Sequence, residues 1–115
     1  MNIEDIRDYC LQKSCTTEEF PFDETTLVFK VAGKMFACLP LERREMLTLK
    51  CDAEYAIELR DRYSAIEPAW HFNKKYWNQL LIPALDDNLI KELIDHSYAE
   101  VVEKLPRRLR AELNL

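Results

Sequence analysis

The chain has 115 residues, of which 48% are hydrophobic and only one is glycine, and its formal net charge is −5. This composition predicts a single domain, residues 1–115, with its own apolar core and no flexible linker. Its apolar runs, such as Leu80–Ile82, are far shorter than the roughly 20 residues of a membrane helix. The first residues are acidic, unlike the cationic start of a signal peptide. We therefore expect a cytoplasmic protein without membrane contact, and a monomer.

The N-terminal half is predicted to contain one helix followed by three strands. Apolar residues at helical spacing predict a helix over residues 2–14, capped by Asn2. The polar segment 16–24 is predicted to be a loop. The apolar period then changes to two, which predicts strands at 25–31, 34–39 and 46–51. The first two of these strands flank Gly33, whose tolerance of positive φ favours a hairpin turn.

The C-terminal half is predicted to contain a helix, a second hairpin and a long helix. The expected ranges are 53–63 for the helix capped by Asp52, 66–72 and 76–82 for the hairpin strands around a tip at 73–75, a long helix from Asp86 or Asp87 to Leu105, and a short helical tail at 107–113. The order α-β-β-β-α-β-β-α predicts an α+β fold. We expect a five-stranded, mainly antiparallel sheet with helices packed on one face.

The sequence offers little for catalysis or metal binding. The cysteines are Cys10, Cys15, Cys38 and Cys51. Their spacing matches no usual zinc site, so we expect reduced, structural thiols and no metal or cofactor. The only histidines, His71 and His96, belong to no metal or phosphate-loop motif. A small enzyme with its site around His71 and Lys74 lacks a recognisable nucleophile and base, so we expect a protein that is not an enzyme.

The charge is distributed unevenly along the chain. Residues 30–50 carry a net charge of +3 and residues 64–84 carry +1, whereas residues 1–29 carry −5, and 51–63 and 85–115 carry −2 each. The predicted hairpins therefore hold the positive charge and the predicted helices hold the negative charge. The net charge of −5, taken over the whole chain, argues against nucleic-acid binding. Its uneven distribution nevertheless allows the hairpins to form a cationic face.

The segment Trp70–Asn78 is the most informative motif. It combines aromatic residues, two lysines, a histidine and two asparagines, the residue types that stack on bases and neutralise phosphates. The alternative is that Trp70, Phe72 and Trp77 are core residues of a hairpin. Hairpin lysines such as Lys30 and Lys34 also serve to prevent strand–strand aggregation.

An acidic cluster near the N-terminus suggests a second function. Its carboxylates are Glu4, Asp5, Asp8, Glu18 and Glu19. Carboxylate oxygens bind hard cations, so the first helix could act as a metal-handling or protein-interaction module. The competing interpretation is the solvated face of an amphipathic helix.

Four blocks of the sequence resemble the MmcQ/YjbR family. They are Lys30–Ala37, Leu49–Asp52, Asn73–Asn78 and Ser97–Tyr98 with Leu105, in the order found in that family. The resemblance implies a fold similar to that of bacterial frataxin (CyaY-like) and DNA binding by hairpins likened to a double wing. One departure is Tyr76, where the family often has histidine.

The resulting hypothesis is a DNA-binding protein that uses the basic face of its two β-hairpins. The residues expected to contact DNA are Lys30, Lys34, Lys50, His71, Asn73, Lys74, Lys75, Trp77 and Asn78. Lysines would neutralise phosphates, while His71, Asn73 and Trp77 would contact bases or sugars. This hypothesis requires the lysines to lie on one connected face.

Overall fold

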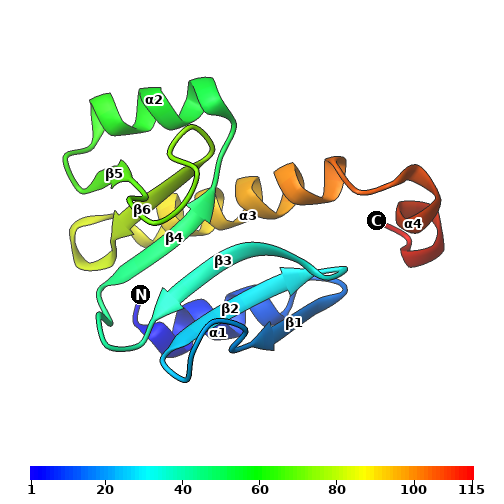
Figure 1. The fold of residues 1–115 in the computed structure, drawn as a ribbon. Coiled ribbons are helices and arrows are strands. Elements are labelled where there is room, and N and C mark those ends of the chain that lie inside the picture. Colours follow the sequence, from blue (N-terminus) through cyan, green and yellow to red (C-terminus); the bar gives the residue numbers. More distant parts are fainter.

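Six strands form one antiparallel sheet in this computed structural model, which describes residues 1–115 (Figure 1). The spatial order is β1-β2-β3-β4-β6-β5. The strands are β1 (Thr16–Glu19), β2 (Thr26–Val31), β3 (Lys34–Pro40), β4 (Met46–Lys50), β5 (Ile66–Pro68) and β6 (Trp77–Leu81). The helices are α1 (Ile3–Leu11), α2 (Ala53–Arg62), the 3-10 helix η1 (Ile82–Ala84), α3 (Asp87–Glu103) and α4 (Arg107–Leu113). No helix has both the length and the hydropathy of a membrane span.

The prediction of five strands is wrong, because the segment predicted as a loop contains β1. This strand pairs with β2 from Thr16↔Val31 to Glu19↔Val28. All of its residues are polar and most are exposed at the edge of the sheet. An edge strand of this kind has no apolar alternation by which the sequence could reveal it.

The second hairpin is also shorter than predicted. Its first strand, β5, ends at Pro68, and residues 69–76 form a long connection to β6. Proline has no N–H for a strand ladder and is confined to edges such as this one. The aromatic residues of 69–76 resemble a strand in composition, but the backbone there is a loop.

The predicted hairpin turn and helix starts are confirmed. Ala32 and Gly33 both have positive φ, 49° and 82°, as the tightest hairpin turns require. Asp52 caps α2 by accepting a hydrogen bond from the N–H of Tyr55, and Asp86 caps α3 in the same way.

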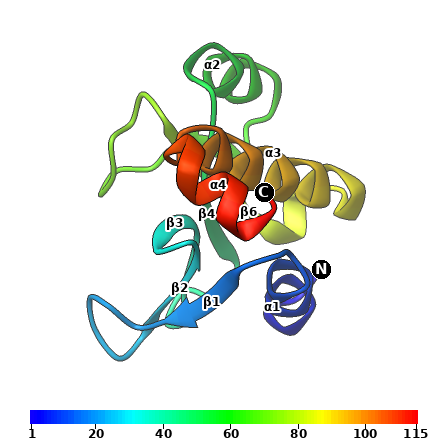
Figure 2. The same cartoon turned by 90° about the vertical axis from the view of Figure 1, so that its right-hand side faces the viewer.

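The helices bury their apolar stripes against one face of the sheet. Figure 2 shows α1 and α3 on the same side of β2 and β3, and α3 contacts β2, β3 and β4. Residues of α1, α2 and α3 share one core cluster with inward-facing strand residues such as Phe29 and Leu49. The other face of the sheet has no helix over it, so its shape is set by the strands and the loops between them.

The sheet opens between its two central strands. β3 and β4 pair only at Ala37↔Leu49 and Cys38↔Thr48, whereas β2 and β3 pair at six positions. Figure 1 shows β3 and β4 diverging beyond this short contact. The sheet therefore has two halves, β1-β2-β3 and β4-β6-β5.

Ser97 of α3 bridges the two halves where they diverge. Its side chain is fully buried. The hydroxyl donates to the carbonyl oxygen of Phe36 in β3 at 2.5 Å and accepts from the N–H of Lys50 in β4 at 2.9 Å. The helix thus supplies the hydrogen bonds that direct strand pairing cannot make there.

Candidate functional site

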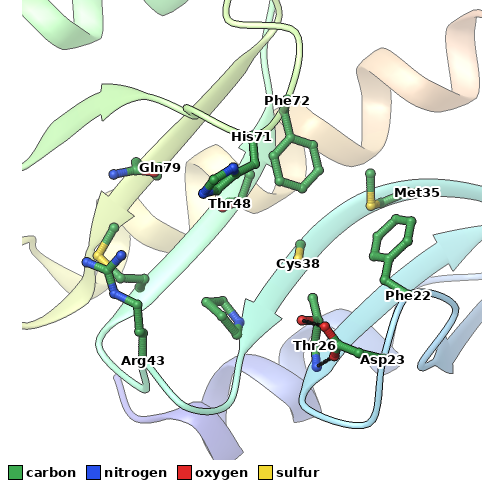
Figure 3. A pocket seen from close by; sticks show the side chains of 12 residues that line it. Phe22, Asp23, Thr26, Met35, Cys38, Arg43, Thr48, His71, Phe72 and Gln79 are labelled. Carbon is green, nitrogen blue, oxygen red and sulfur yellow. Dashed lines mark hydrogen bonds between the residues drawn. The ribbon is translucent and has the colours of Figure 1, made fainter.

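A groove of about 570 Å³ lies on the helix-free face, where β3 and β4 diverge (Figure 3). Cys38 and Thr48 line it, and they neighbour the core residues Ala37 and Leu49 in the strands, so they point away from the core. The floor comes from the strands and consists of Thr26, Met35, Cys38, Pro40, Met46, Thr48 and Gln79. The rim comes from three connecting segments and consists of Phe22, Asp23, Arg43, His71 and Phe72.

The β1–β2 loop forms one wall and is held by Asp23. The carboxylate of Asp23 accepts hydrogen bonds from the backbone N–H of Thr25 at 2.8 Å and of Thr26 at 2.7 Å. Both threonine hydroxyls also donate to it. These bonds lower the pKa of Asp23 below its ordinary value, so this wall carries a fixed negative charge. Beside it, Phe22 is 64% exposed.

The β5–β6 loop forms the opposite wall, and hydrogen bonds from Arg60 hold it in place. The Arg60 Nε donates to the side-chain oxygen of Asn78 at 2.6 Å, and its guanidinium also bonds the carbonyl oxygen of Lys74. Within the loop, the Phe72 ring packs against Trp77 with 5.1 Å between ring centroids. These contacts therefore hold the loop in a defined conformation.

The β5–β6 loop also carries an exposed aromatic residue with a cation on its face, next in sequence to the groove residue His71. Trp70 is 58% exposed, and the Nζ of Lys74 lies 4.4 Å from the centre of its ring. Tryptophan is enriched at interfaces, because its ring is apolar while its N–H can form a hydrogen bond. The interpretation of Trp70 as a core residue is wrong, whereas Phe72 and Trp77 are half-buried.

Cys38 forms a neutral, apolar part of the floor. Its side chain is 3% exposed, and burial, with a smaller contribution from the charge of Asp23, raises its pKa to about 11. The thiol is therefore protonated at neutral pH and is not a nucleophile. The structure has no disulfide, and all four cysteines are free.

A cluster of cations surrounds Tyr76 at the end of the β5–β6 loop. The Nζ atoms of Lys75 and Lys104 lie 5.5 Å and 5.2 Å from the centre of the Tyr76 ring. Lys50, at the end of β4, has a lowered pKa because it is partly buried and because Lys104 repels its charge. Lys50, Lys75 and Lys104 therefore form a cationic cluster, with the carboxylate of Glu100 also acting on Lys50. Lys104 was not apparent from the sequence because it comes from the far end of α3.

The structure brings only part of the predicted DNA-contacting set together. His71 lines the groove, and the exposed Lys74 is close to it on the same loop. The Asn73 side chain instead holds the loop by accepting from the N–H of Lys75 at 3.1 Å. The prediction for Asn78 is wrong: it is 2% exposed, and its amide bonds Arg60 and the carbonyl oxygen of Ala56, so it cannot reach a ligand.

The lysines of the first hairpin differ from those of the second loop. Lys30 pairs with Glu19 of β1 at 3.4 Å, which neutralises its charge locally. Lys34 is exposed at the turn after Gly33 and has no ion pair.

Sequence reasoning also missed Phe22, which lines the groove. The only signal was a pair of phenylalanines around Pro21 in an otherwise polar segment.

Four of the five acidic residues near the N-terminus are engaged within the chain, and the fifth, Asp8, is exposed. Glu18 forms a two-point ion pair with Arg7 at 2.6 and 2.7 Å, and Glu4 pairs with Arg44 at 3.2 Å. The Asp5 carboxylate completes the cap of α1. Because these carboxylates already serve cations and backbone groups, the metal-handling alternative receives no support from the geometry.

Comparisons with known proteins agree with this fold over nearly the whole chain. The profile of the YjbR family matches residues 11–100. The uncharacterized protein YjbR of Escherichia coli strain K12 is 31% identical over 112 residues, which cover 96% of this chain and 95% of that protein. The crystal structure of Deinococcus radiodurans protein DR2400 matches with a TM-score of 0.91 and 36% identity over 98% of this chain and 88% of that one. A Pseudomonas syringae protein matches with a TM-score of 0.70 and 27% identity over 84% of this chain and 96% of that one. The chain belongs to the YjbR family.

Proposed function

We propose that this protein is not an enzyme and that it binds nucleic acid, specifically DNA. The binding surface consists of the groove and the lysine-containing β5–β6 loop beside it. The observation that carries the proposal is Trp70, which is more than half exposed beneath the ammonium group of Lys74. An aromatic face beside a cation allows a base to stack while the adjoining phosphate is neutralised. Such stacking contributes about 1–3 kcal/mol per base.

The cations that support the proposal are on or beside the β5–β6 loop, whose His71 and Phe72 line the groove. Lys74 and Lys75 belong to this loop, and Lys75 shares the Tyr76 ring with Lys104. Lys30, by contrast, is paired with Glu19. The proposal therefore gives the β5–β6 loop the main role and the β2–β3 hairpin a smaller one, which revises the expectation of two equivalent basic hairpins.

The test is DNA binding by a charge-reversed loop, Lys74→Glu with Lys75→Glu. Fluorescence anisotropy of labelled oligonucleotides should show a lower affinity and a shallower salt dependence, by about 0.7 in slope for each lost contact to single-stranded phosphate. Arg62→Glu with Lys91→Glu is the matched control, because it reverses two charges at exposed positions of α2 and α3 outside the β5–β6 loop (Figure 1). Equal binding by the loop variant and the unaltered protein would reject the proposal.

A further inference from the structure

We propose that the ligand is a single strand and that the groove takes one of its unpaired bases, while the strand's phosphates follow the wall formed by the β5–β6 loop. This inference rests on the proposed function and specifies the form of nucleic acid that the site selects. Bases of a duplex are stacked and paired, so only an unpaired base can enter a groove between two walls.

Two polar side chains on the floor of the groove can bond a ligand. Thr48 lines the groove and its side chain points away from the core, so its hydroxyl can donate to or accept from a ligand there. Gln79 lies in the adjacent strand opposite Thr48, and its amide NH₂ bonds Glu67 at 3.3 Å, which leaves its carbonyl oxygen as an acceptor.

These polar groups suit the edge of a base better than a phosphate. A hydroxyl and an amide oxygen can both accept hydrogen bonds, and a base edge offers donors as well as acceptors, whereas a phosphate offers only acceptors. The rest of the floor is apolar, with the neutral thiol of Cys38 and the thioethers of Met35 and Met46. Sulfur atoms make favourable contacts with aromatic rings. A flat base therefore fits this floor, whereas a phosphate does not.

The charges of the two walls explain why one strand fits and two do not. Lys74 and Lys75 belong to the β5–β6 loop, whose His71 and Phe72 line the groove, and the fixed carboxylate of Asp23 lines the opposite side. A duplex presents two rows of phosphates, and one of them would approach the negatively charged wall. A single strand can keep its phosphates beside the lysines and direct a base toward Phe22 and Thr48.

The experiment compares three labelled ligands by fluorescence anisotropy: a strand of about 12 deoxythymidines, a length within the usual range of single-strand sites, its duplex, and the same strand with abasic residues. The single strand should bind at least about tenfold more tightly than the duplex and the abasic strand, a difference of about 1.4 kcal/mol. Thr48→Val keeps the shape and strand preference of the side chain but removes the hydroxyl. It should weaken binding of the single strand by about 2- to 10-fold and leave binding of the abasic strand unchanged.

The outcomes separate this inference from the proposed function. Equal affinity for single strand and duplex, or for normal and abasic strands, overturns the inference while nucleic-acid binding stands. No binding of any of the three ligands overturns both. If a phenylalanine-rich peptide shifts the amide resonances of Thr48 and Phe22 and the oligonucleotides do not, the groove belongs to a protein partner and the inference is wrong.

Discussion

Removal of the Ser97 hydroxyl is expected to weaken the junction between the two halves of the sheet. In Ser97→Ala the carbonyl oxygen of Phe36 and the N–H of Lys50 lose their partner in a fully buried position. Each unsatisfied buried group costs about 1–3 kcal/mol. Alanine favours the helix by up to about 0.5 kcal/mol over serine, so the two groups together give an expected net loss of about 1.5–5.5 kcal/mol in the free energy of unfolding.

Urea denaturation followed by circular dichroism measures this loss, and hydrogen exchange locates it. A loss of this size is a large part of the roughly 5–15 kcal/mol that stabilises an ordinary domain. The amide proton of Lys50 should lose protection more than those of β1, which lies two strands away from β3. Ser64→Ala, at an exposed position, is the control. An unfolding free energy for Ser97→Ala within about 0.5 kcal/mol of the unaltered protein, the range of an ordinary surface substitution, would refute the bridging role.

Three further predictions concern the turn, the thiols and the Asp23 wall. Gly33→Ala should cost about 1–2 kcal/mol in urea denaturation, because the residue has a φ of 82° while a Cβ there meets no atom within 4 Å; Gly33→Asn should cost less. With a thiol reagent at about pH 8, the exposed Cys15 should react in the folded protein and Cys38, with its pKa raised to about 11, should react only after unfolding, as mass spectrometry would show. The lowered pKa of Asp23 means that its stabilisation is complete above about pH 4 and is lost as the pH falls through the folded pKa. The Thr26 amide resonance should therefore move in acid, and Asp23→Asn should abolish that transition.

The elements that the sequence predicts well are those whose signal is local. The turn at Gly33 and the caps at Asp52 and Asp86 depend on a residue and its immediate neighbours. The apolar stripe of α3, with Ser97 among its members, also follows from spacing alone. β1 could not be predicted in this way, because a polar edge strand is defined by its partner, β2, and not by its own residues.

The candidate site was predicted less completely because it depends on tertiary structure. The charge pattern and the segment Trp70–Asn78 indicated the loop that contributes His71 and Phe72 to the groove. However, the sequence could not show that Asn78 faces the core, or that Lys104 comes to lie beside Tyr76. The groove is lined by segments that are far apart in the chain, from Phe22 to Gln79. No local sequence pattern predicts that these segments come together.

The groove and the Ser97 bridge are consequences of the same irregularity in β3. The register between β2 and β3 shifts between Phe29 and Lys30, so that Phe36 has no partner in the β2 ladder. A bulge of this kind bends and twists its strand, and β3 leaves β4 after two paired positions. On the helix side, Ser97 satisfies the backbone groups left by the separation; on the free side, the same separation leaves the groove over Cys38 and Thr48. Ser97 bridges the strands at Phe36 and Lys50, close to the paired residues Cys38 and Thr48 on the groove floor, so the irregular part of β3 and the candidate site occupy the same part of the sheet.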